Sequence, residues 1–228
     1  MIKHFGVLAR SILFQIFNLS WIFGKLPTIW KMSIIVSVLK PGKDAASCKN
    51  FRPISLTSTL CKIMEKIIHS RIVKWLIKRK VLHIYQTAYR AQHNTVDRLF
   101  YLVLSIIDGF QERPHRKTSA VFIDLSAAFD RVWRQKLIEI LHSLCISGNI
   151  LLWINDFLRD RRFAVSVNGR FSRTHRSWAG IPQGSVLSPL LFLLYMNTVD
   201  NHIVNEAKIE CYADDTTIWH SHTDIIIS

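Results

Sequence analysis

Two adjacent aspartates, Asp214 and Asp215, stand in the segment IECYADDTTIW, residues 209–219, among neighbours that otherwise suit a buried strand. Apolar and polar residues alternate before the pair, which predicts one strand entering a tight turn and a second strand leaving it. Two carboxylates held close together repel each other unless a cation lies between them or one takes up a proton. A bare Asp-Asp pair is also typical of a solvated hairpin tip, so the pair alone leaves both interpretations open.

A third aspartate, Asp124, is the first charged residue after the buried strand that we expect through Val121, Phe122 and Ile123. If this strand and the later hairpin are neighbours in one antiparallel sheet, Asp124 converges with Asp214 at its edge. Aspartates with no His or Cys nearby are hard oxygen ligands of the kind that Mg²⁺ prefers. Two such ions can activate a hydroxyl nucleophile and stabilise a leaving pyrophosphate. The alternative for Asp124 alone is a helix N-cap.

The composition limits the classes of partner. The chain has 228 residues, 49% of them apolar, which suits one large domain or two small ones. Lys and Arg number 30 against 16 acids, and the net charge of +14 points to nucleic acid first and an anionic membrane surface second. The four cysteines are widely spaced with no CxxC pair, which argues against a structural zinc site or a disulfide scaffold and fits a reducing compartment.

The N-terminal segment 1–24 is expected to form an amphipathic helix packed on the domain. Leu8, Ile12 and Ile16 follow helical spacing, and Arg10 interrupts the apolar run that a signal peptide would need. No stretch of 18 apolar residues exists in the sequence, so we expect no membrane span. The final segment HTDIIIS resembles the start of a new element, and we expect the sequence to be a piece of a longer chain.

The segments between these regions predict strands and helices that alternate without a parallel βαβ rhythm. We expect a strand ending in a Pro-Gly turn at residues 30–44, a returning strand at 50–59, helices at 57–80, 94–109 and 134–158, a hairpin at 161–172, and a Gly/Pro loop feeding an apolar helix at 180–200. This order predicts an α+β fold with an antiparallel sheet backed by helices. The basic end of the second helix, Lys78-Arg79-Lys80, is expected to be solvated.

In chain order, FIDLSAAFDRV, GIPQGSVLSPLLFLLYMN and YADD resemble motifs A, B and C of reverse transcriptases, most closely those of the non-LTR (LINE-type) retrotransposon class. Upstream, LKPGKD and NFRPISLTSTLCKIMEKI resemble the fingers motifs of that class, and YQTAYRAQHNT resembles the segment that follows them. One such motif is a weak signal, whereas five in order are a strong one. The resemblance implies the fingers and palm of a right-hand polymerase over residues 25–228, with motif D and the thumb absent.

The resemblance also implies a two-metal site and its surroundings. Asp124 and Asp214 would coordinate two Mg²⁺ ions, which Mn²⁺ could replace, with Asp215 assisting and the Leu125 carbonyl as a further ligand. The residues expected at the incoming nucleotide are Lys40, Arg52, Leu125, Ser126, Ala127, Ala128, Phe129 and Gln183. Those expected at the template and primer are Gly180, Pro182, Gly184 and Tyr212.

Most of these assignments have a physical reason and a simpler alternative. Lys40 and Arg52 on one basic hairpin suit a triphosphate, because a guanidinium makes forked contacts with phosphate, but both could be ordinary surface charges. Gly180 and Gly184 allow the backbone to approach a ligand closely, or simply allow a loop to enter a helix. Phe129 matches the position that closes on the sugar 2′ carbon in this family, and its alternative is a core aromatic.

The resemblance implies an RNA-directed DNA polymerase that extends a DNA 3′ end with dNTPs on an RNA template, inside the cell and in the nucleus. Its partners would be the RNA template, the DNA primer and dNTPs, with no membrane, and the oligomeric state is open. The alternatives are a decayed transposon remnant that binds nucleic acid without catalysis, a group II intron-type reverse transcriptase, and an RNA-dependent RNA polymerase. Phe129 and the GIPQGSVLSP run favour DNA synthesis, and RPISLTSTLCKIMEKI favours the non-LTR class.

Overall fold

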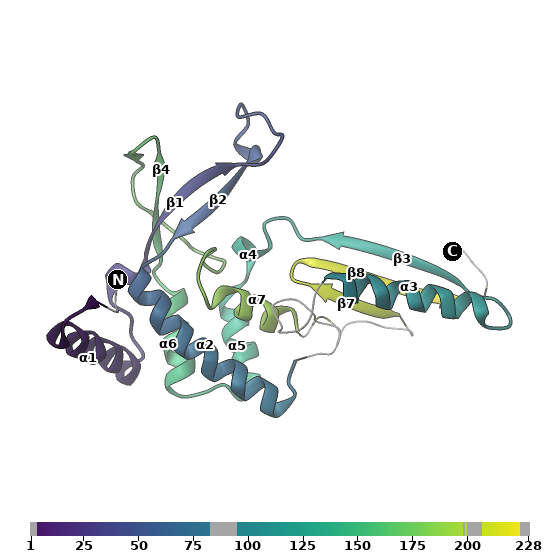
Figure 1. Cartoon of the computed structure of the whole chain (residues 1–228), viewed down its shortest axis with the longest axis horizontal. Coiled ribbons are helices and arrows are strands. Elements are labelled where there is room, and N and C mark those ends of the chain that lie inside the picture. Colours follow the sequence, from purple (N-terminus) through teal and green to yellow (C-terminus); the bar gives the residue numbers. More distant parts are fainter. Residues whose placement is uncertain (1–3, 83–94, 198, 200–206, 224–228) are drawn as a thin grey trace. The chain divides into compact units, whose positions relative to one another are not determined.

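The computed structural model of the chain describes residues 4–82, 95–197, 199 and 207–223. These residues form two compact units (Figure 1), each assembled from two separate stretches of sequence. The first unit comprises Met1–Trp75 and Phe129–Ser188, and the second comprises Leu76–Ala128 and Pro189–Ser228. The expected motif YQTAYRAQHNT lies outside the described residues apart from its last position.

The first unit combines helices with a mixed sheet. Its helical segments are α1 (Val7–Phe23), η2 (Thr28–Lys31), η3 (Cys48–Asn50), most of α2 (Thr59–Arg79), α4 (Ala128–Arg131), α5 (Arg134–Ser143) and α6 (Asn149–Leu158). Its strands are β1 (Met32–Leu39), β2 (Phe51–Leu56), β4 (Arg162–Val167), β5 (Arg170–Phe171) and β6 (His175–Arg176). The strand order is β2-β1-β4-β5, with β6 also paired to β4.

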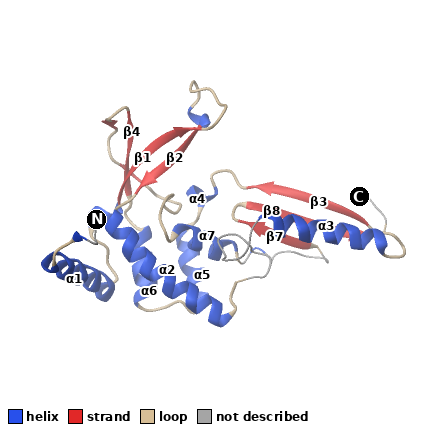
Figure 2. Cartoon of the chain, viewed as in Figure 1, coloured by secondary structure: helices blue, strands red, loops and turns tan. Residues whose placement is uncertain are grey.

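The β1–β2 hairpin is the one that the Pro-Gly turn predicts, with Val38 opposite Arg52 in antiparallel register. On its other edge β1 pairs with β4 in parallel, with Met32 opposite Arg162, and Figure 2 shows β4 beside this hairpin. The sequence analysis did not anticipate the parallel pair. Parallel strands need a long crossover connection, so nothing local in the sequence marks the partner.

Helix α6 provides the centre of the helical core of the first unit. Trp153 is 0% exposed, stacks on Phe157 with ring centroids 5.5 Å apart, and donates from Nε1 to Ser20 Oγ of α1 at 3.0 Å. Ser20 Oγ in turn donates to the Lys25 carbonyl at 2.6 Å, just beyond the end of α1. The N-terminal helix therefore packs on α6 through an aromatic side chain whose polar group has a partner.

The second unit is built on a three-stranded antiparallel sheet with the order β3-β8-β7. Its elements are α3 (Thr95–Gln111), β3 (Lys117–Asp124), nearly all of α7 (Ser188–Met196), β7 (Lys208–Tyr212) and β8 (Asp215–His222). Helix α3 packs on this sheet, where Tyr101 meets Trp219 edge-on with ring centroids 5.5 Å apart. The predicted α+β class with an antiparallel sheet backed by a helix is confirmed.

Strand β3 differs from the expectation. We expected a buried strand through Val121, Phe122 and Ile123, but these side chains are 59%, 69% and 38% exposed. The strand lies at the edge of its sheet and pairs with β8 along one side. An apolar run of this length indicates a strand but does not tell how much of it is covered, so the prediction of burial is wrong.

The end of α2 agrees with the sequence analysis, because Lys78, Arg79 and Lys80 are all exposed. Within the described ranges, no helix has both the length and the apolar character needed to cross a membrane.

Replacing Trp153 by Ala is expected to lower the free energy of unfolding by about 3–5 kcal/mol, the usual cost of truncating a buried Trp. Trp178→Ala is the matched control, since Trp178 is 77% exposed. Its ring is covered by the Arg176 guanidinium, 4.3 Å from the ring centroid, so a loss of about 1 kcal/mol or less is expected. Urea unfolding followed by circular dichroism measures both, and equal losses would contradict the packing described for α6.

Candidate active site

The aspartates predicted to act together lie at one end of the β3-β8-β7 sheet. Asp124 ends β3, Asp215 begins β8, and the two are partners in the antiparallel register. Asp214 lies in the tight turn between β7 and β8, where Tyr212 pairs with Asp215. The neighbouring strands expected from the sequence are therefore present, although Asp215 rather than Asp214 is directly opposite Asp124.

Two alanines beside these aspartates have left-handed backbone conformations. Ala127 follows β3 with φ 55°, and Ala213 precedes Asp214 with φ 57°. A left-handed conformation costs roughly 1–2 kcal/mol for a residue with a Cβ. Such strain persists only where the surrounding structure fixes the backbone, and it is frequent at functional sites. The turn that lacks Gly and Asn in the sequence therefore places its strained residue directly before an aspartate.

The donor set at this end of the sheet suits a hard divalent cation. Asp124 and Asp215 are exposed and Asp214 is half-buried. Directly opposed residues of an antiparallel pair have Cβ atoms about 4.5–5.5 Å apart, within the range in which one ion can bridge two carboxylates. Among the residues that the structure describes, no group of three His, Cys, Asp or Glu side chains is already gathered around a point where a metal could bind. The strand register thus brings two predicted ligands together and leaves the third beside them.

The other residues predicted at the nucleotide fall into two places. Leu125, Ser126 and Ala127 leave the end of β3 as an exposed segment, and Ala128 begins α4. Phe129 is half-buried in α4, and its carbonyl oxygen accepts a hydrogen bond from the Ile181 N–H at 2.9 Å.

The predicted basic hairpin is present. The backbone N–H of Lys40, just after β1, donates to the Asn50 carbonyl at 2.8 Å, and Lys40 Nζ donates to the Lys49 carbonyl at 3.0 Å. Arg52 is exposed on β2. The structure therefore brings Lys40 and Arg52 onto one hairpin, while their contact with a triphosphate stays a prediction.

The Gly/Pro loop before α7 packs tightly against other backbone of the first unit. Gly180 has φ +75°, and a Cβ there would lie 2.6 Å from the Asp130 carbonyl oxygen. Its N–H donates to the Val132 carbonyl at 2.9 Å. Gly184 has φ +83°, and a Cβ there would lie 2.7 Å from the Ser55 carbonyl oxygen. Both glycines are therefore required by their conformation and by close backbone contact.

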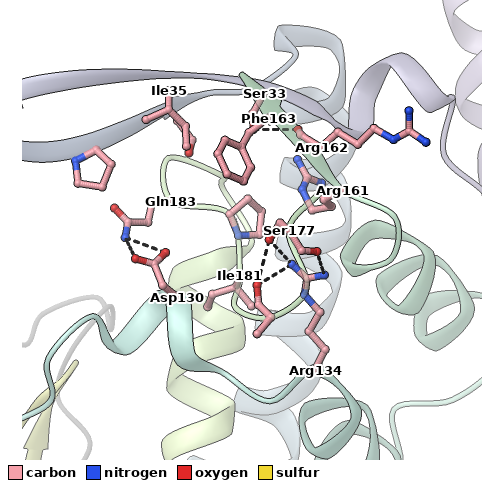
Figure 3. Close-up of a pocket in the computed structure, with 14 residues that line it drawn as sticks. Ser33, Ile35, Asp130, Arg134, Arg161, Arg162, Phe163, Ser177, Ile181 and Gln183 are labelled. Atoms are coloured by element: carbon pink, nitrogen blue, oxygen red, sulfur yellow. Dashed lines mark hydrogen bonds between the residues drawn. The ribbon is translucent and has the colours of Figure 1, made fainter. Parts of the chain in front are cut away.

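Gln183, predicted to contact the nucleotide, has a partner that the sequence analysis missed. Its Nε2 donates to both carboxylate oxygens of Asp130 at 3.2 Å (Figure 3). The residue before Gln183 is fixed as well, since the Pro182 carbonyl accepts a hydrogen bond from Ser188 Oγ at 2.8 Å. Asp130 lies inside the segment FIDLSAAFDRV, so the motif contained it, but nothing in the sequence marked it as the partner of a distant glutamine.

Arg134 fixes the start of the same loop, and it was also missed. Its guanidinium donates to the Gly180 carbonyl at 2.7 Å, to the Ser177 carbonyl and hydroxyl at 2.8 and 2.7 Å, and to the Ala179 carbonyl at 2.7 Å (Figure 3). Burial, together with the nearby Arg161, lowers the pKa of Arg134 to about 10. This value is still well above neutral, so the loop carbonyls bind a charged guanidinium.

Glu65 is the third site residue that the sequence analysis missed, and in this case the sequence did contain a pattern that could have indicated it. Cys61, Glu65, Ile68 and Ile72 follow one another at helical spacing on α2, and each is at most 2% exposed. The sequence analysis predicted this helix but did not single out its buried acid. A carboxylate at a core position of a helix indicates a buried polar partner.

A pocket of about 310 Å³ lies between the β1–β2 hairpin, the start of β4 and the Gly/Pro loop (Figure 3). Ser33 and Ser55 line it from the hairpin, Arg162 from β4, and Pro182 and Gln183 from the loop. Of the residues predicted at the nucleotide and template, Pro182 and Gln183 line the pocket. The two basic residues of the hairpin, Lys40 and Arg52, are not among its lining residues.

The fold resembles that of telomerase. Apo telomerase from Candida tropicalis has a TM-score of 0.61 at 13% identity, covering 94% of this chain and 44% of that chain. Telomerase from the same organism in complex with a fragment of telomeric RNA has a TM-score of 0.58 at 14% identity, covering 92% of this chain and 40% of that chain. A family model described as reverse transcriptase (RNA-dependent DNA polymerase) matches residues 38–227. The chain belongs to this family.

The curated relatives show to which class of reverse transcriptase the chain is similar. The probable RNA-directed DNA polymerase from transposon BS of Drosophila melanogaster is 36% identical over 203 residues, which cover 86% of this chain and 22% of that protein. The RNA-directed DNA polymerase from mobile element jockey of the same organism is 32% identical over 224 residues, which cover 96% of this chain and 24% of that protein. The chain thus spans about a quarter of the length of these relatives. The predicted non-LTR retrotransposon class is confirmed.

Gly180→Ala is expected to destabilise the protein more than Gly169→Ala. Both glycines have φ near +75°, but a Cβ on Gly169 meets nothing within 4 Å, whereas one on Gly180 meets the backbone of Asp130. Both substitutions carry the left-handed penalty of roughly 1–2 kcal/mol, and only Gly180→Ala adds an overpacking cost of about 1–3 kcal/mol. Paired urea titrations give the difference. Equal losses would mean that the loop moves away from Asp130 without cost.

Proposed function

We propose that residues 25–228 form the fingers and palm of an RNA-directed DNA polymerase of a retrotransposon, preceded by a helical lead-in at residues 1–24. The enzyme extends a DNA 3′ end with dNTPs on an RNA template. One observation carries this proposal, namely the register of Asp124 with Asp215 beside the Asp214 turn, in a chain of the reverse transcriptase family. The names of the curated relatives as RNA-directed DNA polymerases support it.

Asp124 and Asp214 are the principal ligands for two Mg²⁺ ions, with Asp215 and the Leu125 carbonyl as further ligands, and Mn²⁺ can substitute. When bound, such ions lower the pKa of the primer 3′-hydroxyl and neutralise charge on the leaving pyrophosphate. The negative charge of the carboxylates is what attracts the cations. The exposure of Asp124 and Asp215 supports this assignment.

The remaining predicted residues bind and orient the substrates. Lys40 and Arg52 contact the triphosphate, and Gln183 contacts the nucleotide with its amide oriented by Asp130. The backbone of Ser126, Ala127 and Ala128 lies along the nucleotide, and Phe129 packs against its sugar. On the template and primer side lie Gly180, Pro182, Gly184 and Tyr212.

The charge of the chain supports a nucleic-acid partner. A net charge of +14 favours binding of an RNA template and a DNA primer through phosphate contacts, and such binding weakens steeply with salt. DNA made for insertion into a chromosome is needed where chromosomal DNA lies, so we place the enzyme in the nucleus.

Primer extension tests the proposal. The purified chain, and a version extended at its C-terminus, are incubated with oligo(dT)-primed poly(rA), dTTP and Mg²⁺, with UTP in a parallel reaction. Extension with dTTP supports the proposal, and extension with UTP instead indicates RNA synthesis. Binding of the primed RNA by both versions without any extension would indicate a nucleic-acid-binding protein with no polymerase activity.

Asp124→Asn and Asp214→Asn are each expected to abolish extension while RNA binding persists. Each substitution removes a ligand charge from the metal site, but the basic surface of the hairpin remains. Asp215→Asn is expected to be less severe, because its contact with metal is less direct. Asp108→Asn, at an exposed position of α3, is the control and should extend at the parental rate. Near-parental extension by Asp214→Asn would remove the metal assignment.

Phe129→Val is expected to raise the use of UTP relative to dTTP at least about tenfold. A ribonucleotide 2′-hydroxyl pressed against the ring loses water without gaining a partner, at a cost of about 1–3 kcal/mol, and each 1.4 kcal/mol is a factor of about ten. The ratio of kcat/KM values on one primed RNA template measures this choice. Phe171→Val, at an exposed position of β5, should leave the ratio unchanged. An unchanged ratio in Phe129→Val with dTTP activity intact would make Phe129 a packing residue.

A further inference from the structure

Glu65 is a charged residue in the core of the first unit. Its side chain is on α2 and is 0% exposed. Its Oε2 accepts hydrogen bonds from the Ser185 hydroxyl, from the Val186 N–H at 2.7 Å and from the Leu187 N–H at 3.2 Å. A buried carboxylate is expensive unless such donors compensate it, so these contacts define where the carboxylate must lie.

The three donors belong to the last part of the Gly/Pro loop, immediately before α7. Ser185 Oγ also accepts from the N–H groups of Leu187 and Ser188 at 3.1 and 3.3 Å. The backbone N–H groups at a helix start have no partner within the helix and must find one elsewhere. Ser185 Oγ binds the first of these groups, the Ser188 N–H, and Glu65 binds the N–H groups of the two residues before the helix, although Glu65 comes from a helix that is distant in sequence.

The buried Glu65 carboxylate also has a charged neighbour, Arg161, and a polar one, Cys61. The Arg161 guanidinium is buried, and its Nη1 donates to the Phe157 carbonyl at 3.0 Å. Burial lowers the pKa of Arg161, whereas the charge of the nearby Glu65 raises it. Burial, followed by the charge of Glu65, raises the pKa of the Cys61 thiol, so the thiol stays protonated and does not compete with the carboxylate for the loop N–H groups.

Gln183 lies between two fixed ends of the loop. At the start, Arg134 binds the carbonyls of Ser177 and Gly180. At the end, Glu65 binds residues 185–187. Only a few residues separate these anchors, so the backbone at Gln183 has little freedom while both hold. Loss of the Glu65 anchor would free the end of the loop at residues 185–187, while the contacts of Arg134 with the start and of Asp130 with Gln183 remain.

We propose that Glu65 is a positioning residue for nucleotide binding, which fixes the end of the loop at residues 185–187 and thereby holds Gln183 toward the incoming nucleotide. Glu65 touches no substrate and acts through the loop. The inference rests on the proposed function for its link to the nucleotide, and on the contacts above for the anchoring itself.

Glu65→Gln tests the proposal while keeping the side-chain volume. A neutral amide oxygen makes weaker hydrogen bonds than a carboxylate, and its NH₂ group would be buried beside the loop donors. We expect the KM for dTTP to rise at least about tenfold, with kcat changed less than about threefold and the Kd for primed poly(rA) changed less than about twofold. Glu139→Gln is the matched control, since the Glu139 side chain is 51% exposed and pairs with Lys136 on the same helix. It should leave all three values unchanged.

A double-mutant cycle shows whether Glu65 acts through Gln183. If it does, Glu65→Gln combined with Gln183→Ala raises KM no more than the larger single effect, because both changes remove the same interaction. A merely structural role for Glu65 predicts additive effects on KM, together with parallel losses of kcat and of template binding. Additive effects of that kind overturn the proposal.

Amide hydrogen exchange tests the anchoring without any activity. In Glu65→Gln, the amides of Val186 and Leu187 should exchange at least about tenfold faster, whereas those of Gly180 and Ile181, bound to the Val132 and Phe129 carbonyls, should not change. Unchanged exchange at residues 186–187 overturns the inference even if the parent is an active polymerase. A parent that extends no primer contradicts the proposed function instead, and the exchange result still decides the anchoring.

Discussion

The β3–β8 ladder fixes the relation of Asp124 to Asp215, and the proposed metal chemistry depends on this register. Side chains alternate between the faces of a sheet, so a slip of one residue would turn one of the two carboxylates to the opposite face. The buried Trp219 on the central strand opposes such a slip, because the slip would turn its ring away from Tyr101 of α3. The carboxylates can therefore be exposed and mutually repelling while their backbone stays in place.

The Gly/Pro loop has no ladder and is fixed in a different way. Arg134 and Glu65 bind it through charged groups that are at least partly withdrawn from water, and the exposed carboxylate of Asp130 binds Gln183. Hydrogen bonds to charged groups are stronger than neutral ones, and their loss leaves a costly unpaired partner. Charged side chains thus fix the position of the irregular loop, as backbone hydrogen bonds between strands fix the position of the sheet residues. The opposed aspartates in the second unit and the loop in the first unit are each held by interactions that tolerate little displacement.

The sequence predicted the features that local pattern encodes. The β1–β2 hairpin followed from Pro41-Gly42, the β7–β8 hairpin from alternation around Asp214, and the class from the order of the motifs. The parallel pairing of β1 with β4 was not predictable in this way, because register between distant strands leaves no local mark. The exposure of β3 was missed for a related reason, since hydrophobicity does not tell which neighbour covers a strand.

The site residues that the sequence analysis missed also depend on contacts between distant parts of the chain. Asp130 and Arg134 are an ordinary acid and base in the sequence, and only their distance to Gln183 and to the loop carbonyls gives them a role. Glu65 differs, because its place on the buried face of α2 was readable from helical spacing. An acid at a buried position of a helix indicates a polar partner in the core, just as the apolar residues around it indicate the core itself. What sequence could not supply was the identity of its partner.

The pairing of β1 with β4 also has a consequence for how the chain is made. Leu39 ends β1 and Arg162 begins β4, so at about 5–20 residues per second the ribosome needs roughly 6–25 s to supply the partner strand. During this interval one edge of β1 is unpaired, and its segment MSIIVSVL carries no charge and no Pro. Uncharged strand edges of this kind recruit other strands. The yield of folded protein therefore depends on protecting β1 during synthesis, a demand that the stability of the finished fold does not reveal.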